Sequence, residues 1–227
     1  MDGDVFVKLH HPRTDADLLA RRLSASSADP FVRPLSQEVL IAPDGRPVTV
    51  WPRVSVASPA TPTQPWAEAG ALLATLHAAP PPAGLPQHGW VDRLHRAIGR
   101  APADLAPLGR ALLTEALGRE EPAALIHGDW HVGQLGFAGS SWKLLDIDDL
   151  GVGDPAWDFA RPAGFWAVGL LGDDDWHAFL AGAGRPSLWD PAWDLPARCA
   201  VFVAAVRAVG QAAAEAEALV EGCRRMS

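Results

Sequence analysis

Two short apolar segments that end in acidic residues constrain this chain more than any other feature. The first, at 125–134, reads LIHGDWHVGQ, and the second, at 144–149, reads LLDIDD. Each apolar run is too short to favour a helix over a strand, and each ends abruptly in carboxylates or histidines. Strands that deliver side chains to a site have this form, so we expect the two ends to bring their acids together.

The spacing of these polar residues has a chemical interpretation. Asp129 follows Gly128 in a turn, where a lone carboxylate can accept a proton from a substrate hydroxyl. Gln134 and Asp146 offer oxygen atoms of the kind that hold a magnesium ion. A base beside a metal fits phosphoryl transfer, in which catalysis consists mainly of positioning the nucleophile and neutralising charge.

Three linked motifs in this region resemble the signature of the aminoglycoside phosphotransferase family, which includes choline-kinase-like enzymes. They are His-Gly-Asp-Trp-His-x-Gly-Gln at 127–134, Leu-Asp-Ile-Asp-Asp at 145–149 and Gly-Asp-Pro-Ala-Trp-Asp-Phe-Ala at 153–160. The resemblance implies an α+β, protein-kinase-like fold with two lobes. A small β-rich N-lobe is expected over 1–57 and a larger helical C-lobe over 58–227, with the boundary at a segment rich in Pro, Ser and Thr.

The resemblance also implies roles for residues of the catalytic loop. Asp129 corresponds to the family's catalytic base, which orients the substrate hydroxyl and accepts its proton. His127 corresponds to a histidine that braces this loop through hydrogen bonds, and His131 is a common family residue at its position. Asp158, at the start of a helix, is expected to tie that helix to the loop.

Magnesium ligands follow from the same resemblance. Asp146 corresponds to the aspartate that chelates magnesium on the nucleotide phosphates, and Asp148 to a second-shell or second-metal ligand. Gln134 departs from the family, which usually has asparagine at this position. Because glutamine adds a methylene group, it can coordinate only if the loop retreats or the metal shifts.

The nucleotide site is expected in the N-terminal part. Lys8 lies near the end of a β-rich hexamer and resembles the lysine that contacts the α- and β-phosphates of ATP, although an edge strand with an exposed lysine has the same pattern. A capping-box spacing from Thr14 to Asp17 predicts a helix, which offers no glutamate to pair with Lys8. An Asp-Gly turn predicts a hairpin over 39–51, and the connection beyond it matches the family's adenine site, formed here by Trp51, Arg53 and Val54.

The start of the sequence departs from the family pattern. In the family, two strands and a loop that covers the nucleotide phosphates precede the lysine strand, whereas seven residues precede Lys8 here. The resemblance therefore predicts a shortened N-lobe without the first two strands. Three explanations are open: coding sequence upstream of Met1, nucleotide binding without the cover, or loss of catalysis. An uncovered site is expected to bind nucleotide more weakly and to admit more water.

Composition narrows the class of protein. The 227 residues are 48% hydrophobic and 20% charged, with a formal net charge of −8, so a nucleic-acid partner is not expected and cationic substrates are mildly favoured. The sequence has no apolar span of membrane length, and its acidic start is unlike a signal peptide. Cys199 and Cys223 form no disulfide framework. We therefore expect a cytoplasmic protein without a membrane partner.

The C-terminal sequence predicts a series of helices. Three are expected near 66–77, 90–99 and 105–118, the last two without a chemical role. Another is expected after Trp157, interrupted around Pro162. One more is expected at 176–180, and a final helical stretch opens at Pro196. The acidic run 173–175 is interpreted as a solvated helix start rather than a site for cations.

Three functions are compatible with the motifs. The first is an ATP- and magnesium-dependent small-molecule O-phosphotransferase acting on a hydroxyl. The second is a catalytically impaired, kinase-like protein that binds a nucleotide or another ligand. The third is a metal-dependent phosphohydrolase, whose ligands would come from the histidines and aspartates of the two motifs: His127, Asp129, His131, Asp146 and Asp148.

Overall fold

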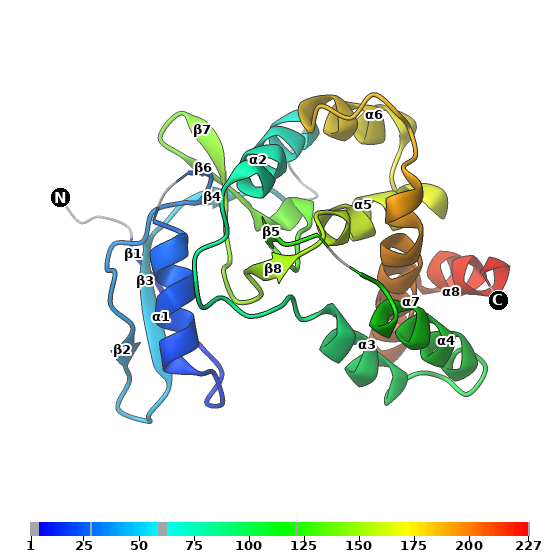
Figure 1. The fold of residues 1–227 in the computed structure, drawn as a ribbon, viewed down its shortest axis with the longest axis horizontal. Coiled ribbons are helices and arrows are strands. Elements are labelled where there is room, and N and C mark those ends of the chain that lie inside the picture. Colours follow the sequence, from blue (N-terminus) through cyan, green and yellow to red (C-terminus); the bar gives the residue numbers. More distant parts are fainter. Residues whose placement is uncertain (1–4, 28, 59–62, 121, 227) are drawn as a thin grey trace.

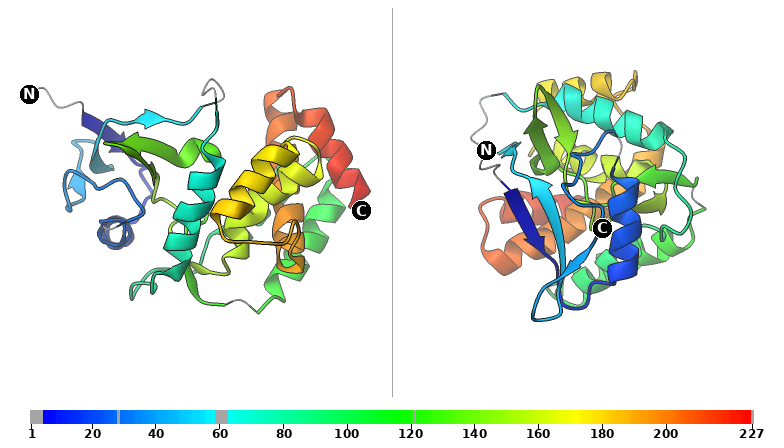
Figure 2. Two further views of the ribbon diagram at one scale, coloured as in Figure 1. Left: turned by 90° about the horizontal axis from the view of Figure 1, so that it is seen from above. Right: turned by 90° about the vertical axis from the view of Figure 1, so that its left-hand side faces the viewer.

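The protein is described by a computed structural model that covers residues 5–27, 29–58, 63–120 and 122–226. The chain has a mixed α+β fold in two unequal parts (Figure 1). A small N-terminal part contains strands and one helix, and a larger part is mainly helical. The left view in Figure 2 shows the same separation from above, and the right view shows the N-terminal strands and helix in front of the larger part. The α+β class expected from the sequence is confirmed.

A three-stranded antiparallel sheet forms the N-terminal part. Its order is β1 (Val5–Leu9), β3 (Pro47–Pro52) and β2 (Leu40–Ile41). The hairpin between β2 and β3 turns at Gly45, whose φ of +83° is the conformation that the Asp-Gly pair predicts. In the register of β1 and β3, Lys8 lies opposite Thr49. Lys8 therefore lies on an edge strand, near its C-terminal end.

Helix α1 (Ala16–Ala25) lies beside this sheet (Figure 1). Its N-cap is Asp15, whose side chain accepts hydrogen bonds from the backbone N–H groups of Asp17 and Leu18. The capping box predicted from Thr14 is therefore wrong by one residue. Aspartate can cap a helix directly, and its charge also interacts favourably with the helix dipole.

Two small sheets lie between the N-terminal sheet and the main body of helices. One has the order β4 (Ser55–Val56), β6 (Leu135–Ala138) and β7 (Ser141–Leu144), and the other pairs β5 (Ala124–Ile126) with β8 (Gly151–Gly153). Strand β4 precedes the predicted lobe boundary yet pairs with β6. The predicted catalytic loop, 127–134, follows β5. The acidic loop, 145–150, joins β7 to β8, so these sheets bring the two motifs together.

Helices form the remainder: α2 (Trp66–Ala78), α3 (Trp90–Ile98), α4 (Ala106–Leu117), α5 (Ala156–Ala167), α6 (Asp173–Gly182), α7 (Asp194–Gln211) and α8 (Ala216–Arg225), with short 3₁₀ turns η1 (Val132–Gln134) and η2 (Pro191–Trp193). Helix α5 continues through Pro162, so the predicted interruption is wrong. Burial of most of α5 outweighs the local cost of a proline, about 3 kcal/mol. The final stretch is two helices, because Ala212 adopts a left-handed conformation after α7.

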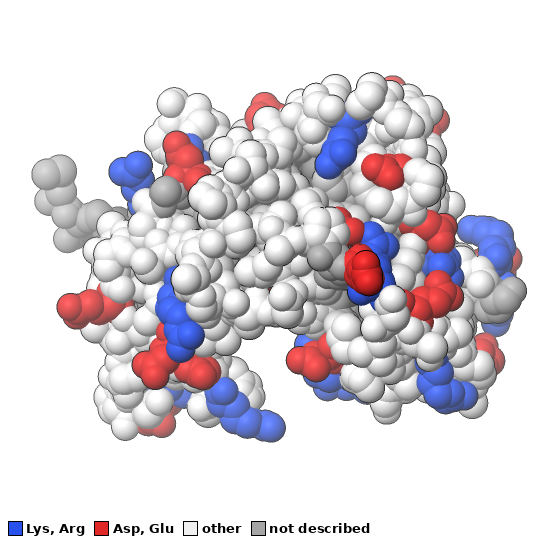
Figure 3. Space-filling model, in the orientation of Figure 1, with Lys and Arg blue, Asp and Glu red and all other residues white. Residues whose placement is uncertain are grey.

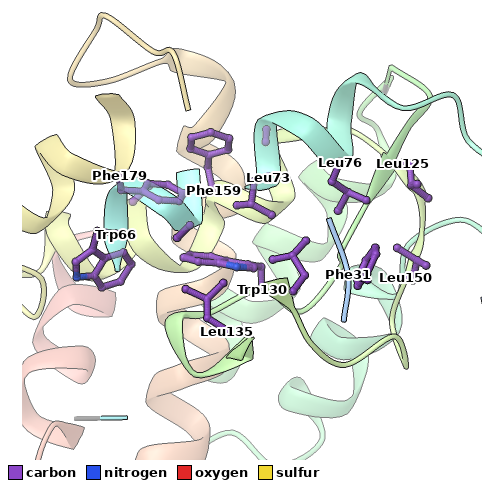
Figure 4. Close-up of a cluster of buried hydrophobic side chains, with 14 of the residues drawn as sticks. Phe31, Trp66, Leu73, Leu76, Leu125, Trp130, Leu135, Leu150, Phe159 and Phe179 are labelled. Atoms are coloured by element: carbon purple, nitrogen blue, oxygen red, sulfur yellow. The ribbon is translucent and has the colours of Figure 1, made fainter. Parts of the chain in front are cut away.

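Aromatic residues fill the core beside the catalytic loop (Figure 4). Trp130 stacks on Phe179 with ring centroids 5.1 Å apart, and Figure 4 shows it lying between Leu73 and Leu135. Helices α2 and α6 approach closely at Gly70 and Gly182, where an added Cβ would lie 2.1 Å and 1.9 Å from backbone oxygens. This packing fixes Trp130, and with it the position of the neighbouring Asp129.

The surface carries both signs of charge. On the face shown in Figure 3, lysine and arginine side chains are interspersed with aspartate and glutamate, and large areas carry neither. Among the described residues, no helix combines the length and apolar character that crossing a membrane requires. Cys199 and Cys223 are buried cysteines, and burial raises the pKa values of their thiols to about 12 and about 11.

Candidate active site

Asp158 organises the backbone of the catalytic loop. Its two carboxylate oxygens accept hydrogen bonds from the N–H groups of His127 (2.8 Å) and Gly128 (2.9 Å), and Oδ2 also lies 2.9 Å from Nε2 of His77. Although burial alone would raise the pKa of Asp158, the hydrogen bond and charge of His77 hold it below its ordinary value. The buried carboxylate therefore joins α5, α2 and the loop at one point.

Gly128 places the catalytic loop against the acidic loop. Its φ is +82°, and an added Cβ would lie 2.3 Å from the carbonyl oxygen of Asp149, so only glycine fits here. On the other side of this contact, Nε2 of His127 lies 2.8 Å from the carbonyl oxygen of Leu145. The structure thus brings together the polar ends of the two motif strands.

The acidic loop meets Lys8 directly. Nζ of Lys8 lies 2.7 Å from Oδ1 of Asp146 and 2.9 Å from Oδ2 of Asp148. Asp146 has a left-handed backbone with φ of 55°, an uncommon conformation that the short side chain of aspartate tolerates. Its Oδ1 also accepts a hydrogen bond from the N–H of Asp148 (3.0 Å). The two aspartates are thus the partners of Lys8 that the sequence did not identify.

The charges of this group adjust one another. Burial would lower the pKa of Lys8, but Asp146 and Asp148 outweigh it and raise that pKa above its ordinary value. Nδ1 of His10 lies 3.2 Å from Oδ1 of Asp148. Burial would raise the pKa of Asp148, yet the hydrogen bond from His10 and the charge of Lys8 lower it to about 2. The pairing of Lys8 with Asp148 therefore keeps the ammonium and the carboxylate charged at neutral pH.

Helix α1 contributes a cation, Arg22, that contacts the backbone of the acidic loop. Nε of Arg22 donates to the carbonyl oxygen of Leu150 (2.9 Å), and Nη1 donates to that of Asp148. The sequence of α1 alone does not predict this contact of Arg22. A long basic side chain on an otherwise buried helix face was the available signal, but its target is set by tertiary structure.

Two arginines flank Asp129. Oδ1 of Asp129 accepts from Nη1 of Arg93 (2.5 Å) and from Nη2 of Arg161 (3.0 Å). Arg93 also donates to Oδ2 of Asp149 (3.1 Å), and its guanidinium lies over the ring of Trp90. Helix α3, for which no chemical role was expected, therefore contacts the predicted base. Arg93 lies 36 residues before Asp129, and Arg161 lies 32 residues after it, directly behind the third motif. Nothing in the local sequence links either side chain to Asp129.

A pocket of about 450 Å³ lies against the lysine and the acidic loop. Most residues predicted for nucleotide and metal binding line it: Lys8, Trp51, Arg53, Val54, Gln134 and Asp146. Asp148 turns instead toward Lys8 and His10. This volume lies within the range typical of ligand sites, about 300–1,000 Å³.

The donor groups at this pocket fit a magnesium ion. Asp146 and Gln134, a carboxylate and an amide, line the same space, and the hydrogen bonds of Asp146 with Lys8 and with the N–H of Asp148 both use Oδ1. Magnesium in nucleotide sites takes one or two carboxylates, with phosphates and water completing its shell. The phosphohydrolase interpretation requires a denser cluster of histidine and aspartate side chains around the metal. Within the described ranges, no three His, Cys, Asp or Glu side chains are close enough to hold a metal.

Comparison with known proteins identifies the family. A profile described as the phosphotransferase enzyme family matches residues 2–200. The chain belongs to this phosphotransferase enzyme family. The profile spans all three motifs, from the lysine strand to beyond Asp158. A sequence comparison with curated proteins gives no significant match.

Solved structures of phosphotransferases share the fold. A choline kinase, LicA, from Streptococcus pneumoniae has a TM-score of 0.69 at 11% identity, covering 99% of this chain and 87% of that one. A choline/ethanolamine kinase family protein from Mesorhizobium loti scores 0.64 at 17% identity, with 98% and 82% coverage. The AMP-bound spectinomycin phosphotransferase APH(9)-Ia scores 0.61 at 16% identity, with 99% and 84% coverage. At these identities the likeness concerns the fold alone.

Proposed function

We propose that this phosphotransferase family member transfers the γ-phosphoryl group of ATP to a hydroxyl of a small molecule, with magnesium as cofactor. One observation carries the proposal: Lys8 meets the acidic loop at 2.7 and 2.9 Å beside a 450 Å³ pocket that also contains Gln134 and the predicted adenine contacts. A cation, oxygen ligands and a cleft of this size together suit a nucleoside triphosphate. Family membership supports transfer to a small molecule.

Each residue has a part in the proposed reaction. Lys8 binds the α- and β-phosphates, exchanging some of its contact with the aspartates for phosphate oxygens. Asp146 and Gln134 hold magnesium, which neutralises charge on the phosphates. Asp129 orients the acceptor hydroxyl and takes its proton while the acceptor oxygen bonds to the γ-phosphorus. The bond from that phosphorus to the β-phosphate oxygen breaks at the same centre, and ADP leaves.

Isothermal calorimetry with ATP, with and without magnesium, tests the nucleotide site. Asp146→Ala should abolish the magnesium dependence of binding, whereas Asp175→Asn, an exposed carboxylate on α6, should leave it unchanged. ATP hydrolysis in the absence of acceptor and transfer to a panel of alcohols then test the chemistry. Asp129→Asn should retain ATP binding and lose transfer. Full transfer by Asp129→Asn would refute the assigned role.

A second function is favoured by the surroundings of Asp129. Because one of its oxygens accepts from both Arg93 and Arg161, two cations compete with any hydroxyl for this carboxylate. A protein that binds nucleotide without transferring phosphate would have the same site. Magnesium-dependent ATP binding without turnover in wild type, together with turnover gained in Arg93→Gln, would identify this case. Turnover by wild type that depends on Asp129 would exclude it.

A further inference from the structure

A second cavity is lined by residues 130–132 of the predicted catalytic loop, next in sequence to the residues 133–134 that line the first pocket. Its volume is about 150 Å³. Apolar side chains from four segments form most of its wall, among them Trp66, Trp130, Phe165 and Leu171. This cavity is open to solvent on one side, and its volume is about that of an apolar cavity that holds benzene, so it suits one ring-sized apolar group.

The polar groups of this cavity are a cation and a neutral ring. Arg161 lines it and also donates to Oδ1 of Asp129 (3.0 Å), so the cavity and the proposed base share one side chain. His131 lines it as well, and burial together with the charge of Arg161 lowers its pKa to about 4. None of the described residues that line the cavity is acidic. A polycationic ligand would therefore find no counter-charge there.

Further cations lie near Arg161. Burial is the largest cause that lowers the pKa of Arg161; the charge of Asp129 opposes it, and the charges of Arg93 and Arg207 lower the pKa further. Arg161 has five N–H donors in a planar group, and one contact to Asp129 leaves others for a bound anion.

We propose that the acceptor is an alcohol that carries a ring-sized apolar group and an anionic group, with the ring in the cavity and the anion on Arg161. This inference rests on the proposed function, because it places the hydroxyl at Asp129. It differs from the weak expectation of a cationic substrate drawn from the net charge of −8. The local charge at the site, rather than the charge of the whole chain, selects the ligand.

Mandelate is a suitable probe, because it combines a hydroxyl, a carboxylate and one phenyl ring. Mandelamide lacks the charge, lactate lacks the ring, and kanamycin supplies a polycation. Binding is measured by tryptophan fluorescence and calorimetry without nucleotide, so a failure of phosphoryl transfer leaves this test intact. We expect saturable binding of mandelate, with mandelamide and lactate each weaker by about tenfold or more, as loss of a charge-assisted hydrogen bond or of a buried ring predicts.

Variants separate charge from shape. Arg161→Gln should bring mandelate and mandelamide to equal affinity, and Arg161→Lys should restore part of the difference. Arg207→Gln removes a nearby cation that does not line the cavity and should preserve the difference. Leu171→Trp fills the cavity and should weaken mandelate by about tenfold while sparing lactate. Thermal unfolding of each variant shows that it folds.

Several results would overturn the proposal. They are absence of saturable mandelate binding, equal affinity of wild type for mandelate and mandelamide, and tighter binding of kanamycin that survives Arg161→Gln. Unchanged mandelate affinity in the folded Leu171→Trp variant would show that the ring lies elsewhere. If mandelate binds as expected while no alcohol is phosphorylated, the cavity assignment stands and the proposed transfer reaction fails.

Discussion

His131 should make the stability of the protein fall steeply below neutral pH. Burial and the charge of Arg161 lower its pKa from 6.5 to about 4. As pH falls through 6.5, His131 takes up a proton in the unfolded chain but remains neutral in the folded one. The unfolded state then binds more protons, so folding loses free energy between pH 6.5 and pH 4. The difference between these two pKa values corresponds to at most about 3 kcal/mol.

Urea unfolding followed by tryptophan fluorescence measures this loss at pH 7, 6, 5 and 4. The His131→Gln variant lacks the titrating ring, so its free energy of unfolding should fall less than that of wild type, by up to about 3 kcal/mol over this range. His177→Gln removes an exposed histidine of α6 and serves as the matched control. Parallel curves for wild type and His131→Gln would show that the reasoning about burial is incorrect.

An NMR titration of the His131 ring separates the two causes. Arg161→Gln should raise the pKa of His131, but not to 6.5, because burial is the larger cause and remains. An unchanged pKa in this variant would mean that the guanidinium does not act on the ring.

Three further predictions concern the catalytic and acidic loops. Asp158→Asn should lower the free energy of unfolding by about 2–4 kcal/mol, because buried donors on His77, His127 and Gly128 lose a charged acceptor; a loss below about 1 kcal/mol in urea unfolding would contradict this. Gly128→Ala should lower the free energy of unfolding by several kcal/mol, about 2 kcal/mol or more beyond the loss in Gly45→Ala. Both glycines have φ near +82°, but only a Cβ at Gly128 would clash, with the carbonyl oxygen of Asp149. Equal losses in the two variants would disprove the clash. Gln134→Leu should raise the magnesium concentration needed for half-maximal ATP binding by about tenfold in calorimetry. Gln37→Leu, at an exposed glutamine, is the control. An unchanged magnesium requirement in Gln134→Leu would show that Gln134 is not a metal ligand.

The sequence predicted those parts of the fold and site that depend on local pattern. The family and the α+β class follow from three closely spaced motifs and are confirmed. The hairpin follows from an Asp-Gly pair whose backbone preference is intrinsic to glycine. The roles assigned to Asp129, Gln134 and Asp146 remain predictions, although the structure places the last two at one pocket.

The features that the sequence did not reveal depend on tertiary contacts. Arg93 reaches Asp129 from α3, and Arg161 reaches it from α5, through side chains whose direction no local pattern fixes. Pro162 was expected to interrupt a helix, because its intrinsic cost is visible in sequence whereas the burial that offsets it is not. Thr14 and Asp15 are both good caps, and a difference of one residue is beyond what pattern reasoning resolves.

The acidic loop makes polar contacts with both parts of the molecule and so links them. Lys8 of β1 and Arg22 of α1 hold this loop from the N-terminal part, while Arg93 of α3 holds Asp149 from the helical part. A rigid-body rotation of one part against the other would strain these ion pairs and the hydrogen bond of Arg22. A ligand that replaces the contacts of Lys8, Arg22 or Arg93 with this loop would therefore change how rigidly the two parts are held together, in addition to filling its own pocket.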